Sequence, residues 1–192
     1  SDENLVTIDS LLVQGKLYSS LIDTLDYVLN DKDINSIVTP VITSEELKLR
    51  LSSLNEKTPF NLAYNIALEK MIHRYLLQRK KYYPALMAKA NYYFPMFERY
   101  LDQYNIPLEM KYLAIVESAL RPKIKSRVGA TGLWQFMYGT GKQFDLKVSS
   151  YVDERQDPVK ATIAACKYLK QLFTIFGDWD LVLASYNTGP GN

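Results

Sequence analysis

Several residue types that would define a particular class of protein are scarce in this sequence. The 192 residues include one cysteine and one histidine, so no disulfide can form within the chain and a structural zinc site lacks ligands. Lys and Arg exceed Asp and Glu by only 23 to 21, too even a balance for a nucleic-acid-binding surface. No apolar run is long enough to cross a bilayer, and no signal-peptide pattern stands at Ser1. We therefore expect no metal, no cofactor and no nucleic acid, and we interpret Cys166 as a buried apolar residue.

Helical periodicity is the main secondary-structure signal, and it is strongest after residue 60. After the helix that begins at Asn65, helices are predicted near residues 82–94, 95–103, 107–117, 140–144, 157–176 and 179–186. The break at Pro95 is predicted because proline removes a helical hydrogen bond. The Thr140 side chain has capping-box spacing for the start of its helix. Asn65 opens an amphipathic helix whose predicted buried stripe consists of Leu68, Met71, Ile72, Tyr75 and Leu76.

The same pattern predicts the domain organisation and the fold class. Residues 1–60 show a weaker helical pattern and are interpreted as an N-terminal extension, mostly helical or irregular, whereas residues 61–192 form one domain. Strand signals are nearly absent. We expect a mostly α protein with at most a small β-hairpin near residues 129–136.

One acid and one amide stand in apolar surroundings. Glu117 follows the apolar run 113–116, where burial would disfavour the charged carboxylate and raise its pKa. Gln135 stands between Trp134 and Phe136, after a glycine-containing loop. An acid and an amide in an apolar pocket suit proton donation to a polar substrate. An ordinary alternative is that Glu117 is an exposed residue at a helix end and that Trp134 and Phe136 are core residues.

No second catalytic carboxyl group is evident near Glu117. Hydrolysis of a glycosidic bond usually requires two carboxyl groups. Asp145, Asp153, Glu154 and Asp157 follow in the sequence, but they stand in helix-cap or turn contexts, where structural roles explain them. A single acid is sufficient only where the substrate supplies its own nucleophile.

Three short motifs occur in order along the chain: Glu117–Ser118, Gly132–Gln135 and Ser185–Asn187. Together they resemble the motifs of the family 1 lytic transglycosylases, the lysozyme-like enzymes of glycoside hydrolase family 23. The flanking segments Leu108–Leu113 and Asp157–Thr162 are most similar to the membrane-bound lytic murein transglycosylase D branch. Each motif is weak alone, but three with matching spacing are specific. The resemblance covers roughly residues 65–192 and implies a lysozyme-like, α+β but mostly helical fold.

The resemblance also implies a reaction and a role for each motif residue. Glu117 would act as general acid and then as base, cleaving the β-1,4 bond between MurNAc and GlcNAc in peptidoglycan. The C6 hydroxyl of the sugar attacks, so the product is 1,6-anhydro-MurNAc and no water is consumed. Trp134 would be a packing residue or a sugar-stacking wall. Substrate binding would involve Ser118 near the acid, Gln135 at sugar hydroxyls or the acetamido group, Met137 as an apolar wall, the Tyr186 hydroxyl beside the reacting sugar, and Asn187 as support for its loop.

Two departures from the family pattern keep other functions open. Ser185 stands where Ala is commoner, and the chain stops at Asn192, where family members continue through further helices, so we expect a domain truncated at its C-terminus. The alternatives are a hydrolase like the goose-type lysozymes and a non-catalytic peptidoglycan-binding protein. The expected partner is the peptidoglycan glycan strand, and the expected location is the periplasm or the outer-membrane-associated envelope. Anchoring through a removed N-terminal leader or lipid is compatible with the sequence, which leaves the oligomeric state open.

Overall fold

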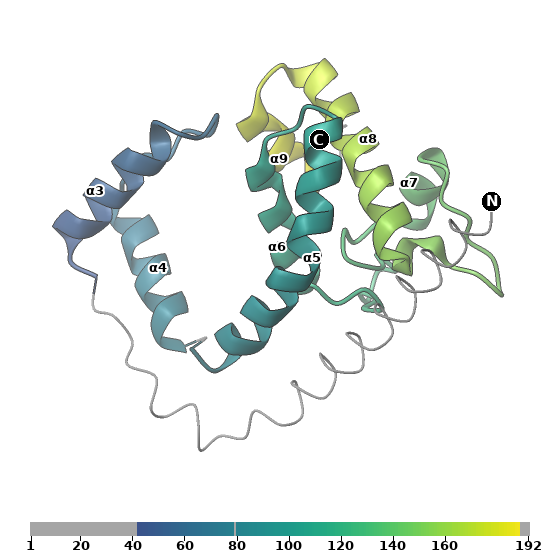
Figure 1. Ribbon diagram of the computed structural model, residues 1–192, viewed down its shortest axis with the longest axis horizontal. Helices are drawn as coiled ribbons and strands as arrows, with labels where there is room; N and C mark the ends of the chain where they lie inside the picture. The colour runs from purple at the N-terminus through teal and green to yellow at the C-terminus, as the bar shows by residue number, and fades with distance from the viewer. Residues whose placement is uncertain (1–41, 79, 189–192) are drawn as a thin grey trace, which may run out of the picture. The chain divides into compact units, whose positions relative to one another are not determined.

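The computed structural model describes residues 42–78 and 80–188, which contain seven α-helices, three short 3₁₀ helices and no β-sheet (Figure 1). Residues 1–41 of the predicted N-terminal extension lie outside the described residues. None of the described helices has the length and apolar character that a membrane span requires. The elements in chain order are α3 (Ser44–Asn55), α4 (Ile66–Gln78), η1 (Lys80–Tyr82), α5 (Tyr83–Gln103), η2 (Leu108–Tyr112), α6 (Leu113–Ser118), α7 (Tyr138–Gln143), η3 (Glu154–Gln156), α8 (Pro158–Phe176) and α9 (Trp179–Thr188). The prediction of a mostly helical fold is confirmed.

The described residues group into two compact units. One unit contains residues 66–92, and the other contains residues 43–65 together with the chain from residue 93 onward. All the candidate site residues lie in the second unit. The predicted boundary between an extension and a domain at residue 60 stays a prediction.

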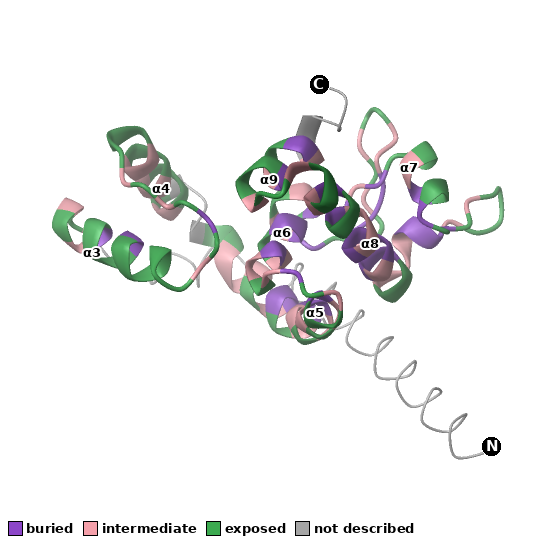
Figure 2. Cartoon of the chain, turned by 90° about the horizontal axis from the view of Figure 1, so that it is seen from above, coloured by how far each residue is buried: buried purple, intermediate pink, exposed green. Residues whose placement is uncertain are grey.

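The core of the second unit is built around α8. Residues of its inner face, among them Thr162, Cys166 and Leu169, are fully buried, and Figure 2 shows this buried surface along α8 and α6. The indole of Trp134 packs against Phe97 with ring centroids 5.1 Å apart, and its Nε1 donates a hydrogen bond of 3.0 Å to the Thr162 hydroxyl. Because Trp134 is 0% exposed, it is a packing residue and not a sugar-stacking wall.

Local capping explains where the last two helices begin and end. The Asp157 carboxylate accepts hydrogen bonds from the backbone N–H groups of Val159 and Lys160, and Pro158 occupies the first turn, where it loses no hydrogen bond. Gly177 ends α8 in the left-handed conformation at φ 67°. Asp178 then caps α9 through the N–H of Leu181. These caps confirm both predicted ends of α8 and the predicted start of α9.

The predicted helix break at Pro95 is wrong, because α5 runs through it from Tyr83 to Gln103. Proline leaves the carbonyl of the residue four positions earlier without its helical donor. That residue is Asn91, and both positions are exposed, so water can satisfy the freed carbonyl. Tyr93 and Phe97 are buried and stacked, with ring centroids 5.9 Å apart, and they pack the helix into the core on the face opposite the proline.

Three other local predictions need correction. The stripe predicted to be buried on α4 is incomplete, since Met71 and Tyr75 are 53% and 55% exposed. Thr140 does not begin a helix, because α7 starts two residues earlier with Met137 as its N-cap and without a side-chain cap. The helix that carries Glu117 begins as the 3₁₀ segment η2 after Pro107 and becomes α-helical only at Leu113.

Candidate active site

Glu117 lies in the last turn of the short helix α6 and is half-buried. Its carboxyl group makes no hydrogen bond and no ion pair with any residue in the described part of the chain. Burial raises the pKa of Glu117 above its ordinary value of 4.5, because desolvation penalises the carboxylate. The predicted direction of this pKa shift is confirmed. A carboxyl group with this environment can hold a proton and present it to a ligand.

The chain reverses direction directly after this acid. Helix α6 ends at Ser118, one residue past the predicted end near Glu117, and Ala119 and Leu120 follow in the left-handed region at φ 50° and 58°. Non-glycine residues in this region cost about 1–2 kcal/mol each. The buried Leu120 side chain, 1% exposed, compensates for part of this cost by its burial. The turn directs the chain into the loop that carries the second motif.

Ser118 lies beneath the acid, within the protein. It is 3% exposed, and its hydroxyl lies 2.9 Å from the carbonyl oxygens of Ala114 and Leu133, either of which can accept its hydrogen. These distances tie the end of α6 to the second motif. The prediction that Ser118 contacts substrate stays a prediction, and its contact with Leu133 shows that it also helps to position the loop.

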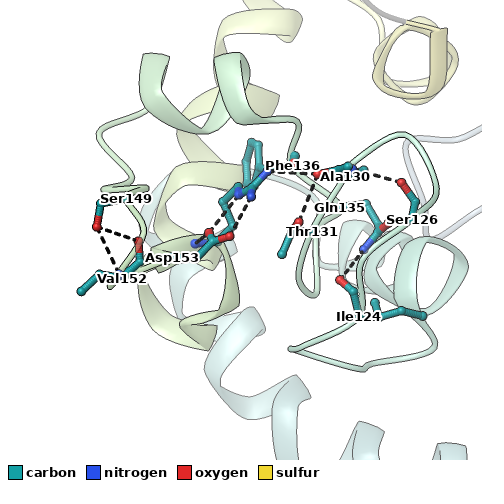
Figure 3. Close-up of polar contacts among 11 residues, drawn as sticks. Ile124, Ser126, Ala130, Thr131, Gln135, Phe136, Ser149, Val152 and Asp153 are labelled. Carbon is teal, nitrogen blue, oxygen red and sulfur yellow. Dashed lines mark hydrogen bonds and ion pairs between the residues drawn. The ribbon is translucent and has the colours of Figure 1, made fainter.

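The second motif lies in a compact loop that folds back on itself (Figure 3). Thr131 and Phe136 exchange two backbone hydrogen bonds, 3.0 and 3.1 Å long, and Thr131 also forms a bridge to Lys125. These isolated bridges agree with the expectation of at most a small hairpin near residues 129–136. The turn between Thr131 and Phe136 places Gln135 at φ 46°, a strained value for a residue with a side chain.

Gln135 is half-buried, and its side-chain nitrogen is used inside the loop. Nε2 donates to the carbonyl oxygen of Gly132 at 2.9 Å and, less directly, to that of Ile124 at 3.4 Å, as Figure 3 shows for Ile124. The side-chain oxygen of Gln135 accepts no hydrogen bond from the described residues. The amide is therefore oriented by the loop, and its oxygen is the part that can accept a hydrogen bond from a ligand.

A buried arginine that the sequence analysis did not single out holds this loop in place. The Arg155 side chain is 5% exposed and donates to the carbonyl oxygens of Gly129 and Phe136 at 3.1 and 3.2 Å. Its other nitrogens form a two-point pair with the Asp153 carboxylate at 2.9 and 2.7 Å. The Arg155 guanidinium lowers the pKa of Asp153, mainly through these hydrogen bonds. The conformation of the loop thus depends on a residue about twenty positions away in the sequence. No sequence motif identifies Arg155.

Tyr186 approaches the same loop from α9. Its hydroxyl donates a hydrogen bond of 2.8 Å to the carbonyl oxygen of Trp134, and its ring lies 5.3 Å from that of Tyr168. Desolvation raises the pKa of Tyr186 well above 10.0, and the Glu117 charge raises it further. The phenol therefore stays protonated, and it lies within electrostatic range of the Glu117 carboxyl group.

The two remaining predicted site residues differ in what can be said of them. Met137 is 45% exposed at the start of α7, so it is not a core residue, and its thioether is open to a ligand. Asn187 belongs to the last turn of α9 by its backbone, but its side chain lies outside the described residues. Its predicted role stays a prediction.

The four other acids near the site each have a structural partner. Asp145 pairs with Lys167 at 2.8 Å, and Asp153 pairs with Arg155. Glu154 accepts from the backbone of Lys147 and pairs with Lys160 at 2.6 Å, while Asp157 caps α8. This agrees with the structural roles expected from the sequence and leaves Glu117 as the acid of this region without a partner among the described residues.

The three sequence motifs therefore meet around one loop. A Ser118–Leu133 contact joins the first to the second, and the Tyr186–Trp134 hydrogen bond joins the third to the second. A helical domain that presents one half-buried, unpaired carboxyl group beside a protonated phenol is a lysozyme-like arrangement, suited to acid chemistry on a sugar.

Comparison with known proteins assigns the family. The sequence model of the transglycosylase SLT domain matches residues 95–192, more than half of the chain. The chain therefore belongs to the SLT domain family, which confirms the resemblance to the family 1 lytic transglycosylases and the mostly helical, lysozyme-like fold.

Two curated relatives are lytic transglycosylases of Escherichia coli (strain K12). The chain is 32% identical over 139 residues to membrane-bound lytic murein transglycosylase D, an overlap of 72% of this chain and 30% of the relative. It is 36% identical over 105 residues to the soluble lytic murein transglycosylase, an overlap of 52% of this chain and 16% of the relative. The chain thus spans less than a third of either enzyme.

A solved structure shows the same fold. The crystal structure of the 70-kDa soluble lytic transglycosylase from Escherichia coli superimposes with a TM-score of 0.51 at 25% identity, covering 91% of this chain and 28% of that enzyme. The same enzyme has also been solved in complex with bulgecin A.

Proposed function

We propose that this chain carries the catalytic site of a lytic transglycosylase that cleaves the β-1,4 bond between MurNAc and GlcNAc in peptidoglycan glycan strands. The observation that carries the proposal is the environment of Glu117, whose half-buried carboxyl group has a raised pKa and no partner among the described residues. Family membership and the names of both E. coli relatives support the substrate class.

In the proposed reaction, Glu117 first gives its proton to the glycosidic oxygen, and the bond between that oxygen and C1 of the muramic sugar breaks. The N-acetyl group of that sugar helps to stabilise the positive charge that develops at C1. The C6 hydroxyl oxygen then bonds to C1 while the Glu117 carboxylate takes the hydroxyl proton. The acid is regenerated, a 1,6-anhydro-MurNAc end forms, and no water is consumed. One carboxyl group is sufficient because the nucleophile belongs to the substrate.

The neighbouring residues have distinct proposed roles. The side-chain oxygen of Gln135 accepts a hydrogen bond from a sugar hydroxyl or from the acetamido N–H. Met137 supplies an exposed apolar surface for the sugar, and Tyr186 places its hydroxyl beside the reacting sugar. Ser118 positions the Gln135 loop from below, and Asn187 supports the segment that carries Tyr186. The location that fits this activity is the periplasm or the outer-membrane-associated envelope.

The test is digestion of purified peptidoglycan by the wild-type chain and by Glu117→Gln, with mass spectrometry of the released fragments. We expect anhydro ends from the wild type and a loss of about 10²–10⁴-fold in the variant, because a positioned general acid contributes that much. Glu109→Gln is the matched control, since Glu109 is a partly exposed glutamate of the preceding segment η2.

The alternative outcomes are distinguishable. Reducing MurNAc ends in place of anhydro ends would show a hydrolase like the goose-type lysozymes. Equal, minimal release by the wild type and Glu117→Gln, with both proteins retained on cell walls, would show a binding protein without catalysis.

A further inference from the structure

A strip of four cations borders the candidate site. Arg121, Lys123, Lys125 and Arg127 occupy alternate positions between α6 and the Gln135 loop, and all four are exposed. The residues between them, Pro122, Ile124 and Ser126, are partly buried. The four cationic side chains are thus all open to solvent within one short segment, and we refer to these four residues as the cationic strip.

The positive charge of the cationic strip is not neutralised locally. None of its four side chains forms an ion pair or a side-chain hydrogen bond with another residue in the described ranges. Between Glu117 and Asp145 the sequence contains no acid at all. Lys125 does contribute to the lowered pKa of Asp153, but both oxygens of that carboxylate are already bonded to Arg155. The strip is therefore free to attract an external anion.

The cationic strip is also joined directly to the loop that orients Gln135. The carbonyl oxygen of Ile124, in the middle of the strip, accepts hydrogen bonds from Gly132 N–H at 2.9 Å and from the Gln135 side chain at 3.4 Å. Lys125 forms a backbone bridge with Thr131, and Ser126 N–H donates to the Ala130 carbonyl. In return, Ala130 N–H donates to the Ser126 hydroxyl at 3.0 Å (Figure 3). A group bound along the strip therefore lies beside whatever Gln135 binds.

We infer that the cationic strip binds the carboxylates of the peptide stems that are attached to the muramic sugar. This inference rests on the proposed function and adds a second recognition element to the same site. Stem peptides carry free carboxylates and hang from the same sugar that Glu117 and Gln135 would engage. The segment from Arg121 to Arg127 spans at most roughly 20 Å, so a short peptide attached to the bound sugar can reach its cations. An anionic lipid surface offers phosphates instead, but it would not be presented by the sugar in the site.

The experiment compares glycan strands that keep their stems with strands from which an amidase has removed them. At about 0.05 M salt, we expect the wild type to show a KM that is about three- to tenfold lower for the stem-bearing strands. Raising the salt to about 0.5 M should close this gap, because exposed charges are screened. Lys123→Gln combined with Arg127→Gln should also close it. The control, Lys57→Gln combined with Lys170→Gln, removes the same charge from exposed positions elsewhere and should keep the gap.

A binding measurement separates this inference from the proposed function. Calorimetric titration of Glu117→Gln with free stem peptide does not depend on cleavage, and we expect heat of binding that disappears when the strip is neutralised. Equal KM values for both strands in the wild type, or a gap that persists in the strip variant, would overturn the inference while cleavage itself stands. If neutralising the strip abolished binding to phosphatidylglycerol vesicles but left stem binding unchanged, the strip would be a lipid-binding surface. That result would also overturn the inference. Absence of anhydro product from both strands would instead refute the proposed function, and the titration would still decide about the strip.

Discussion

Glu117 differs from the acids around it in having no partner among the described residues. Asp145 pairs with Lys167 and Asp157 caps α8, while hydrogen bonds from Arg155 and Lys160 lower the pKa values of Asp153 and Glu154. Desolvation has the opposite effect at Glu117 and raises its pKa. At the scale of single residues, the site therefore contains one carboxyl group with a raised pKa and no partner, among acids that already have partners.

Tyr186 is the other residue whose environment can be tested singly. Tyr186→Phe removes the hydroxyl that donates to the Trp134 carbonyl at 2.8 Å, and we expect a loss of about 1–2 kcal/mol in unfolding free energy because that part-buried carbonyl loses its donor. Anhydro-product release should fall as well. Urea denaturation and product analysis measure the two effects.

Tyr168→Phe is the matched control for this prediction. Its ring packs in the same aromatic cluster, but its hydroxyl has no hydrogen bond to the described residues. Its unfolding free energy should change by less than about 0.5 kcal/mol. A Tyr168 variant as unstable as the Tyr186 variant would contradict the structural role given to the Tyr186 hydroxyl.

At the scale of elements, the loop of residues 129–136 is the point at which the three motifs meet. It has few regular backbone hydrogen bonds of its own, so hydrogen bonds from Ser118, Arg155 and Tyr186 determine its shape. Strained backbone occurs here as well, at Ala119, Leu120 and Gln135. Strain persists where the surrounding contacts over-determine the conformation, as at many functional sites.

Substitution of two glycines tests how closely this loop packs against the Arg155 backbone. Both Gly129 and Gly132 have positive φ, 92° and 88°, so an alanine at either position is strained by about 1 kcal/mol. At Gly132, a Cβ atom would also lie 1.8 Å from the Arg155 carbonyl oxygen, whereas at Gly129 it would meet nothing within 4 Å. We expect Gly132→Ala to cost more than about 3 kcal/mol in unfolding free energy and Gly129→Ala about 1 kcal/mol. Equal losses in urea denaturation would show that the loop moves away from Arg155 at little cost.

At the scale of the whole molecule, the titrating groups have opposing effects on stability. The lowered pKa of Asp153 contributes stability above pH 3.8, and this stability is lost as the pH falls through the folded-state pKa. The raised pKa of Glu117 acts in the other direction: its contribution is fully present below pH 4.5 and is lost as the pH rises through the folded-state pKa.

These signs predict opposite changes in two variants. The quantity to compare is the unfolding free energy at pH 7 minus that at about pH 3. Asp153→Asn should make this difference smaller than in the wild type, and Glu117→Gln should make it larger. Urea denaturation at the two pH values measures both, and a change of the same sign in both variants would contradict the assigned environments.

The amino-acid sequence alone determined the helices with strong local signals and the family of the chain. Asp157, Pro158 and Gly177 act on their own neighbours, so the ends of α8 could be predicted without knowledge of the tertiary fold. The apolar run before Glu117 similarly predicted its raised pKa, because much of the desolvation comes from adjacent residues. The three motifs indicated the family for the same reason: they are contiguous in the chain.

Tertiary structure alone decided the features that depend on distant partners. Pro95 stays inside α5 because Tyr93 and Phe97 pack on one side while the freed carbonyl faces water on the other. Ser118 is buried because Leu133, fifteen residues later, offers its hydroxyl an acceptor. Arg155 carries no motif, yet its hydrogen bonds hold the loop that orients Gln135. Each of these outcomes depends on contacts between segments far apart in the chain, and local sequence patterns do not encode such contacts.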